Sequence, residues 1–192
     1  MRVSRLTALS ALVLGLATLF ACDRKDDGYR TTGQKNRSTE PRSGGSSDTA
    51  WLPRAAEANL AEIDAGRLAE SKGTSADVRQ FGQQMAEDHS KANTELTDLA
   101  TKKGVTLPSR PDDKHLKAAA ELADLAGAEF DKKYADMMVT DHEKAVSLFD
   151  SHSSASDPDV KEFVDKTLPT LKHHLQMARD LKGKLTGTPK AD

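Results

Sequence analysis

The chain has 192 residues, enough for one domain with appendages, and its formal net charge at pH 7 is only −2. This near-neutral balance gives no basic excess, so we expect no nucleic-acid partner. The single cysteine excludes an intramolecular disulfide and a cysteine-based zinc cage, and aromatic residues make up only 4% of the chain. Ala, Leu, Lys, Glu and Asp dominate, which favours an all-α protein over a β-sandwich.

The first 22 residues are typical of an exported lipoprotein. Two arginines open the chain, and the uncharged run from Leu6 to Phe20 is shorter than the ~20 residues that span a bilayer as a helix. The run closes on Leu19-Phe20-Ala21-Cys22, which resembles the lipobox in which the cysteine is lipidated. We therefore expect a signal peptide at residues 1–21 and a lipid on Cys22. The alternative is an ordinary cleaved signal peptide with an incidental cysteine.

The lipid would anchor the protein to a membrane of the cell envelope, on the periplasmic side of the inner or the outer membrane. From Asp23 to about Asp48 the chain is rich in Gly, Ser, Thr and mixed charges, with too little apolar surface to fold. We expect residues 22–48 to be the lipidated cysteine and a disordered tether, residues 49–186 to be the folded domain, and residues 187–192 to be a disordered tail.

Helical periodicity continues through nearly all of the folded domain, and turn residues divide it into helices. Gly73 and Gly104 suit C-terminal caps, and Asp157-Pro158 suits an N-cap followed by a proline in the first turn. Short loops join the first two and the last two long helices, so each pair is antiparallel and the four form a bundle. A short extra helix lies between the second and third long helices. The expected ranges are about 53–72, 76–103, 112–127 (the short helix), 128–152 and 158–184.

Two of the long helices carry the same motif, in which an aromatic residue, a methionine, an Asp-His pair and an alanine recur with one spacing. The two copies are Phe81, Met85, Asp88-His89 and Ala92, and Tyr134, Met138, Asp141-His142 and Ala145. Such duplication is expected of a bundle with internal two-fold pseudosymmetry.

Each long helix also places one polar residue on its apolar face: Glu62, His89, His142 and His174. One carboxylate and three imidazoles suit a divalent transition metal such as Fe, Zn or Cu. The alternative is a structural polar cluster in which Glu62 pairs with a protonated histidine. Met85 and Met138, one turn before their histidines, would favour copper if they were ligands, although methionine at this spacing is commonly core packing.

The other polar residues near the histidines have less definite roles. Asp88 and Asp141 lie about 100° around the helix from the neighbouring histidine, so we expect them to cap, to pair across helices or to face water. We expect His115, His152 and His173 at the surface.

These residues resemble the domain of unknown function 4142 family of bacterial envelope proteins, over about residues 50–183. The resemblance implies a ferritin-like four-helix bundle and no established activity. Di-iron ferritin-like sites need a glutamate three residues before the histidine, where this chain has Ala86, Val139 and Leu171, so ferroxidase chemistry does not follow from the fold. The matching stretches are Ala58-Asn59-Leu60-Ala61-Glu62-Ile63, Met85-Ala86-Glu87-Asp88-His89, Met138-Val139-Thr140-Asp141-His142, and Thr167-Leu168-Pro169-Thr170-Leu171 with His174-Leu175.

Two functions therefore compete. The first is a membrane-tethered metal-binding protein for envelope metal handling or stress protection, and the second is a metal-free interaction or scaffold module of the envelope. Catalysis has the least support, because the sequence has no nucleophile motif, phosphate loop or haem attachment sequence. No protein partner can be named. A ferritin-like fold is compatible with a homodimer, but no residue marks an interface.

Overall fold

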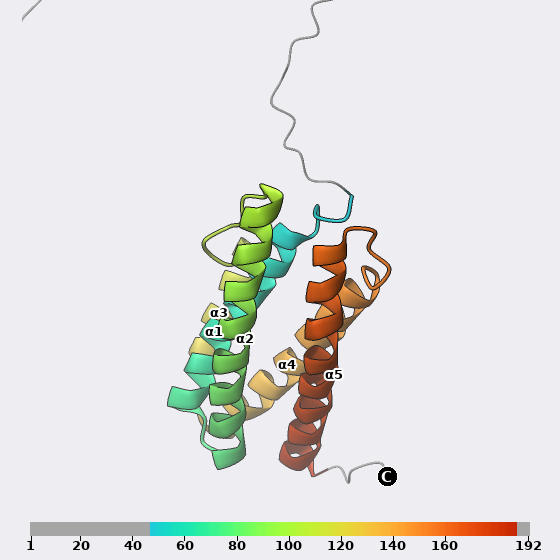
Figure 1. The fold of residues 1–192 in the computed structure, drawn as a ribbon. Helices are drawn as coiled ribbons and strands as arrows, with labels where there is room; N and C mark the ends of the chain where they lie inside the picture. Colours follow the sequence, from blue (N-terminus) through green and yellow to red (C-terminus); the bar gives the residue numbers. More distant parts are fainter. Residues whose placement is uncertain (1–46, 188–192) are drawn as a thin grey trace, which may run out of the picture. The chain divides into compact units, whose positions relative to one another are not determined.

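The structure is a computed structural model that describes residues 47–187, and this part of the chain is all-α (Figure 1). It confirms the expected bundle of four long helices with a short helix between the second and third. None of the helices in this range combines the length and apolar character needed to cross a membrane. Cys22 and the predicted tether up to residue 46 lie outside the described residues, whereas Asp48, predicted as the end of the tether, forms part of the folded domain. The helices are α1 (Leu52–Lys72), α2 (Ala76–Lys103), α3 (Asp113–Ala123), α4 (Gly127–Asp150) and α5 (Pro158–Thr186).

The helix boundaries follow from capping residues. Ser75 and Asp157 accept hydrogen bonds from backbone N–H groups of the first turns of α2 and α5, and Gly104 ends α2 in a left-handed conformation. The short helix α3 ends at Ala123, earlier than the expected boundary near Gly127. It stops there because Ala126 is extended, with φ −144° and ψ 164°, and forms the N-cap position of α4.

The four long helices form two antiparallel hairpins, α1–α2 and α4–α5. Helix α1 also packs against α4, and α2 against α5, so α2 and α4 occupy one diagonal of the bundle. Figure 1 shows α2 and α4 running in the same direction, with α3 in the connection between them. This is the single-crossover arrangement of ferritin-like bundles. The two copies of the repeated motif therefore face each other across the core, where the rings of Phe81 and Tyr134 are 6.1 Å apart.

Two glycines allow the closest approach between α1 and α2. A Cβ atom added at Gly66 would lie 2.7 Å from the carbonyl oxygen of Gly82, and one added at Gly82 would lie 2.7 Å from the carbonyl oxygen of Gly66. Both glycines lie in helix interiors, where glycine is less favourable than alanine by about 1 kcal/mol. The contact explains their presence and fixes α1 against α2 one turn away from Glu62.

The buried side chains of the described residues form two apolar clusters, one toward each end of the bundle. One contains Met85, Phe130, Tyr134 and Met138, and the other contains Trp51, Leu96, Phe149 and Phe163. Glu62, His89, His142 and His174 are buried but belong to neither cluster. The core thus has a polar layer between two apolar regions.

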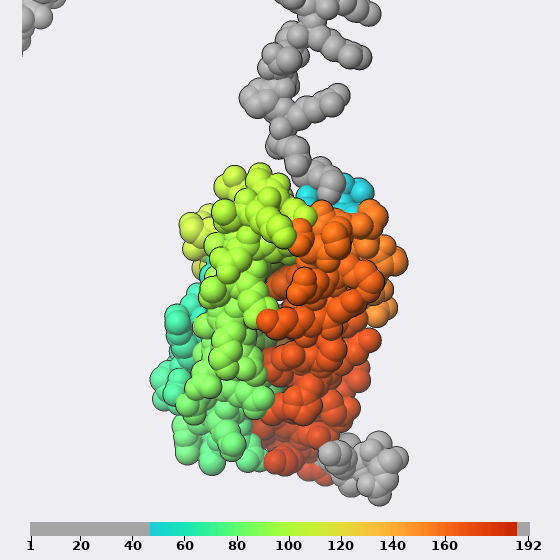
Figure 2. Space-filling model, viewed as in Figure 1, coloured from blue at the N-terminus to red at the C-terminus, as the bar shows by residue number. Residues whose placement is uncertain are grey.

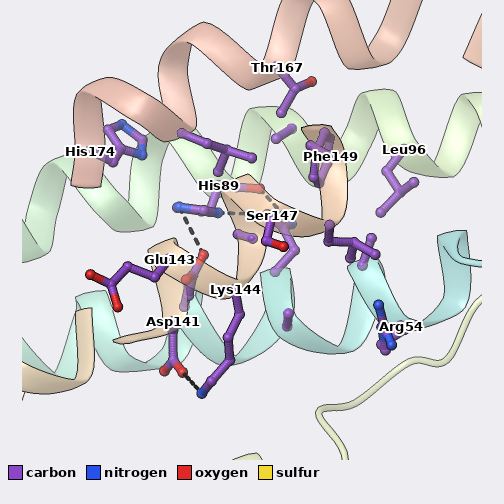
Figure 3. Close-up of a pocket in the computed structure, with 18 of the residues that line it drawn as sticks. Arg54, His89, Leu96, Asp141, Glu143, Lys144, Ser147, Phe149, Thr167 and His174 are labelled. Carbon is purple, nitrogen blue, oxygen red and sulfur yellow. Dashed lines mark hydrogen bonds and ion pairs between the residues drawn. The ribbon is translucent and has the colours of Figure 1, made fainter. Parts of the chain in front are cut away.

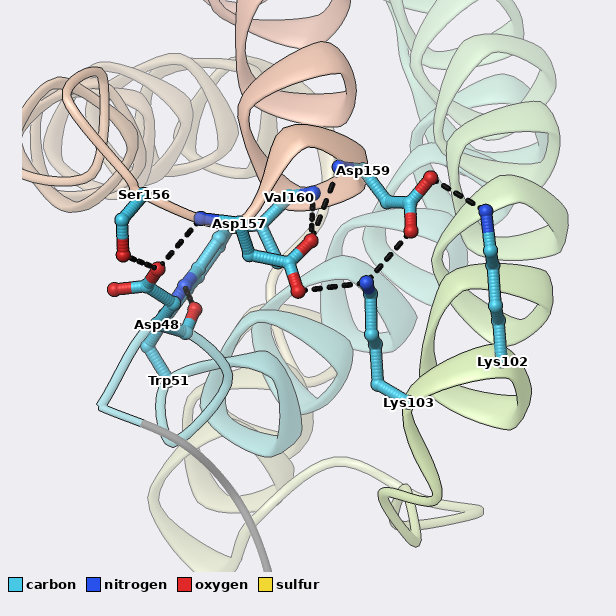
Figure 4. A network of polar contacts seen from close by, with 8 residues as sticks. All are labelled: Asp48, Trp51, Lys102, Lys103, Ser156, Asp157, Asp159 and Val160. Carbon is cyan, nitrogen blue, oxygen red and sulfur yellow. Dashed lines mark hydrogen bonds and ion pairs between the residues drawn. The ribbon is translucent and has the colours of Figure 1, made fainter.

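A polar network closes the end of the bundle near Trp51 (Figure 4). Asp48 Oδ2 accepts hydrogen bonds from Ser156 Oγ at 2.7 Å and from the Asp157 N–H at 2.8 Å. Lys103 Nζ donates to carboxylate oxygens of Asp157 and Asp159, each at 2.6 Å. The bond from Lys103 lowers the pKa of Asp157, and bonds from Lys102 and then Lys103 lower the pKa of Asp159. The same two carboxylates raise the pKa of Lys103. The start of the domain, the end of α2 and the start of α5 are held together at this end.

Candidate metal centre

The structure brings the four predicted polar residues together at the middle of the bundle, one from each long helix. Glu62, His89, His142 and His174 are 4%, 4%, 0% and 1% exposed. The three imidazole rings surround a common point, with centroids 5.4 to 5.5 Å apart in all three pairs. The pattern of one polar residue per apolar face therefore corresponds to one cluster.

Each histidine uses one ring nitrogen to hydrogen-bond an oxygen on the periphery of the cluster. His89 Nδ1 is 2.8 Å from Asn59 Oδ1, and His142 Nδ1 is 3.0 Å from the Met138 carbonyl oxygen. His174 Nε2 is 3.2 Å from Asp88 Oδ2. Carbonyl and carboxylate oxygens only accept, so each of these nitrogens is the one that carries the proton.

The orientation of the Asn59 amide is set by its other contacts. Its Nδ2 donates to the His89 backbone carbonyl oxygen at 2.9 Å and to Asn93 Oδ1 at 3.3 Å. The amide oxygen is therefore the atom that faces His89 Nδ1. Asn59 and Asp88 thus hold the histidines in the way that outer-shell hydrogen-bond partners orient metal-ligating histidines in other proteins.

The second nitrogen of each ring carries a lone pair and faces the centre of the cluster. His89 Nε2, His142 Nε2 and His174 Nδ1 are buried and have no hydrogen-bond partner among the described residues. One ligand atom from each histidine lies within 4.8 Å of the others. Imidazole nitrogens bind zinc at about 2.0–2.1 Å, so each ring has to move inward by less than about 1 Å to share one ion. The three lone pairs could therefore act together as donors to one metal ion.

Glu62 lies beside this donor set. Its Oε2 is 3.1 Å from His89 Nε2, without the alignment of a hydrogen bond, and its Oε1 is 3.5 Å from His142 Nδ1. A carboxylate oxygen and a nitrogen lone pair repel each other unless a proton or a cation lies between them. Burial raises the pKa of Glu62, which allows it to hold that proton when no metal is present. Bound metal would replace the proton and take the carboxylate as a fourth donor.

Burial also keeps His89 and His174 uncharged. Desolvation, followed by the neighbouring His142 and His174, holds the pKa of His89 well below its usual value of 6.5. Desolvation and His142 lower the pKa of His174 to about 4, against the opposing effect of Asp88. Neutral imidazole is the form that binds metal, so at pH 7 these two rings need not lose a proton to do so.

A cavity of about 760 Å³ adjoins the cluster on the side of Trp51 and is lined by all four long helices and the start of α3. Figure 3 shows His89 and His174 toward one end of this pocket, with Leu96 and Arg54 toward the other. In the space-filling view the surface is hollowed between the upper halves of α2 and α5 (Figure 2). Glu62, His89 and His174 line the cavity, whereas fully buried His142 does not.

Sequence reasoning missed Asn59 and left the role of Asp88 open. Asn59 is buried one turn before Glu62 on the same helix, and a polar residue there was the available signal. Of the three options for Asp88, the structure has the pairing across helices. Asp141 instead pairs with Lys144 near the surface, so the two copies of the Asp-His motif differ in their partners.

Two of the three remaining histidines are less exposed than expected. His173 is exposed, as expected, but His115 and His152 are half-buried. His115 is paired with Asp112 at 2.7 Å, and His152 is stacked on Trp51 with ring centroids 4.6 Å apart. Apolar contacts that the sequence pattern does not reveal draw His152 inward. Met85 and Met138 are fully buried members of one apolar cluster.

The model of a family described as "Domain of unknown function (DUF4142)" matches residues 33–181. No curated protein matches the chain significantly. One similar solved structure is "Crystal structure of DUF305 fragment from Deinococcus radiodurans", with a TM-score of 0.64, 12% identity, and coverage of 71% of this chain and 95% of that one. Another is "CopM in the Cu(I)-bound form", with a TM-score of 0.61, 15% identity, and coverage of 73% of this chain and 98% of that one. At these identities the similarity concerns the fold alone.

Proposed function

The chain belongs to the DUF4142 family, and we propose that this member binds a single transition-metal ion through His89, His142 and His174, with Glu62 as an additional ligand. One observation carries the proposal: three buried lone pairs from three helices face one another without hydrogen-bond partners among the described residues. Buried polar atoms in proteins are nearly always satisfied, so three such atoms facing one another indicate a missing partner. A cation would satisfy all three at once.

The donor set narrows the choice of metal. Three imidazoles and one carboxylate suit Zn, Cu or Fe, and are poor ligands for Mg or Ca, which prefer oxygen. A protein of similar fold is described in a Cu(I)-bound form, which is a reason to include copper in both oxidation states among the metals tested. We propose that the site serves metal handling, as a carrier or a store.

We also propose that the protein works in the cell envelope, tethered by a lipid on Cys22. The support is the sequence pattern of residues 1–22 alone. A tether between Cys22 and the bundle would let the metal centre exchange ions with the periplasm while remaining at the membrane. The partners proposed are the membrane and, for the ion, a metal donor or acceptor protein. Neither nucleic acid nor a particular protein is proposed.

The metal proposal is tested on the full chain, solubilised in detergent and purified without a metal-binding tag from cells supplied with Zn, Cu or Fe. Mass spectrometry of the protein is expected to find about one ion per chain in wild type. We expect the His89→Gln/His174→Gln variant to lose it. His173→Gln is the matched control, because His173 is exposed beside His174 and should leave the metal content unchanged. Equal metal in all three proteins, with circular dichroism showing each folded, would overturn the proposal.

A second candidate function rests on the contact between Glu62 and His89. Glu62, whose pKa burial raises, lies 3.1 Å from His89 Nε2, and a small reorientation would let the protonated carboxyl donate to this nitrogen. That would make a metal-free polar layer that fixes helix register in an interaction module. This alternative predicts that added metal and added chelator leave the melting temperature unchanged. A rise with one metal that disappears in the double variant would exclude it.

A further inference from the structure

We propose that the metal bound at the three histidines keeps one coordination position open to the adjoining cavity, where it binds a small organic ligand. The ligand has a nitrogen donor that meets the metal and an apolar body that occupies the cavity. The inference rests on the proposed metal site and extends it, because it assigns the site a second component that the cluster residues alone do not require.

The two sides of the polar layer are filled differently. On one side, the residues four positions before His89 and His142 are Met85 and Met138, both fully buried in an apolar cluster. On the other side, the residues three positions after the same histidines are Ala92 and Ala145. The repeated motif therefore places large side chains on one side of the histidines and small ones on the other.

The remaining helices add to this asymmetry. Ala58, one turn before Glu62, lines the cavity, and so does Leu171, one turn before His174. Three alanines and one leucine thus form the layer next to the proposed metal site. In a close-packed core, larger side chains would interdigitate in this layer. The cavity of about 760 Å³ is of the size that holds a small organic molecule.

The cavity borders three of the four cluster residues. Glu62, His89 and His174 line it, whereas His142 is 0% exposed and does not. A metal ion held by the three nitrogens and Glu62 would therefore take a cavity ligand as a fifth donor, or in place of Glu62. Sites with three protein ligands and an open position are those that accept exogenous ligands.

The walls determine which ligands would be selected. Beyond the alanines the cavity is lined by Leu96, Phe149 and Phe163, so its interior is largely apolar. Charged residues of both signs, including Arg54, Asp141 and Lys144, lie at its rim, and Lys144 is paired with Asp141 at 2.8 Å. This mixed rim does not favour one ligand charge. The apolar walls favour a donor group attached to an aromatic or aliphatic body.

The test uses the full chain loaded with Co(II), whose visible bands respond to the number and kind of its ligands. Imidazole is the probe for the donor alone, and 4-phenylimidazole is the probe for the donor with an apolar body. We expect both to change the cobalt spectrum, with cobalt content equal before and after. We expect 4-phenylimidazole to bind at least about tenfold more tightly, since a phenyl group is removed from water.

A filled cavity provides the matched variant. Ala92→Leu places a larger side chain in the layer beside the metal and is expected to bind Co(II) but to lose the preference for 4-phenylimidazole. Ala120→Leu, on an exposed position of α3, should behave as wild type. Cobalt binding without a spectral response, equal affinities for the two probes, or an unchanged preference in Ala92→Leu would each overturn this inference and leave the metal site standing. Failure to bind cobalt, zinc or copper would overturn the metal site itself.

Discussion

Asn59, Asp88 and the Met138 carbonyl accept hydrogen bonds from histidine nitrogens on the periphery of the cluster. These bonds place the proton of each ring on the outside and the lone pair on the inside. The same residues also hold the ring planes, so the three lone pairs face one another before any metal arrives. In the proposed metal site, the orientation of the ligands would thus depend on groups that do not themselves touch the metal.

Asn59 provides a direct test of this orientation. In Asn59→Ala, His89 loses the acceptor for its Nδ1–H, and we expect metal affinity to fall by about 10- to 100-fold, the effect typical of outer-shell substitutions. Affinity is measured by competition with a chromophoric chelator. Glu70→Ala is the control, because Glu70 is exposed on the same helix. Equal affinities in wild type and Asn59→Ala would show that the hydrogen bond does not orient the ligand.

The metal-free protein is expected to lose stability as the pH falls from about 6.5 toward about 4. Burial depresses the pKa of His89 and His174 in the folded state, so the unfolded chain takes up protons here that the folded chain does not. For His174, a folded pKa of about 4 against 6.5 corresponds to roughly 3 kcal/mol at the acid end. Glu62, whose pKa burial raises above 4.5, opposes this loss by binding a proton in the folded state.

This dependence is measured by urea unfolding with a chelator present, followed by the fluorescence of Trp51, the only tryptophan of the chain. Trp51 is 6% exposed, so unfolding changes its environment. His174→Gln should reduce the loss of unfolding free energy at acid pH, and Glu62→Gln should increase that loss. A free energy of unfolding that stays constant or increases between pH 6.5 and 4 would contradict the assignment of neutral buried histidines.

Among the helices, the α1–α2 hairpin sets the position of the carboxylate relative to the imidazoles. Its closest approach is at Gly66 and Gly82, one and two turns from the residues that the site uses on each helix. At such a contact no side chain is available to adjust, so the distance between the two helix axes is fixed by backbone atoms. The separation of Glu62 from His89 depends on this contact.

The substitution Gly66→Ala tests this contact, because the sign of the change in the free energy of unfolding shows whether the two helices touch. In an uncrowded helix interior, Gly→Ala stabilises by about 1 kcal/mol. Here the new Cβ would lie 2.7 Å from the Gly82 carbonyl oxygen and 2.8 Å from the Ala86 nitrogen, so we expect Gly66→Ala to destabilise by about 1–3 kcal/mol. Chemical denaturation measures the change. A gain in stability would show that the helices are not in contact at this point.

The helices and the four cluster residues could be predicted from the sequence because both depend on periodicity. A polar residue in an apolar stripe, such as His174 between Leu171 and Ala178, can be recognised from the sequence alone. The contacts of Asn59 and Asp88 depend on the rotation of neighbouring helices, which periodicity does not specify. The cavity depends on three alanines from three helices occupying one layer. Only their positions in space show that no large side chain fills the gap.

At the scale of the whole molecule, a bundle with a hollow beside its polar layer is attached to an N-terminal segment that carries the predicted lipid site. The described part of the chain holds the proposed metal site, and residues 1–22 hold the predicted export pattern. The proposed function needs both, because the pattern predicts that the domain is exported to the periplasm.

Lipidation is tested by metabolic labelling of bacteria that express the full chain. We expect radioactive palmitate to label the wild type and not Cys22→Ser, and the unlabelled variant to be released from membranes. Cys22 is the only cysteine, so loss of the label identifies its site without ambiguity. If the wild type were instead recovered as an unlabelled protein that is not bound to membranes, its signal peptide would be an ordinary cleaved one.

The central claim is that three imidazole nitrogens share one metal ion, and X-ray absorption at the metal edge of the zinc-loaded protein tests it most directly. The account predicts about three imidazole nitrogens near 2.0–2.1 Å, with a further oxygen or nitrogen donor, and loss of this shell in His142→Gln. A shell containing sulfur, a shell of oxygen alone, or a spectrum unchanged in His142→Gln would contradict it.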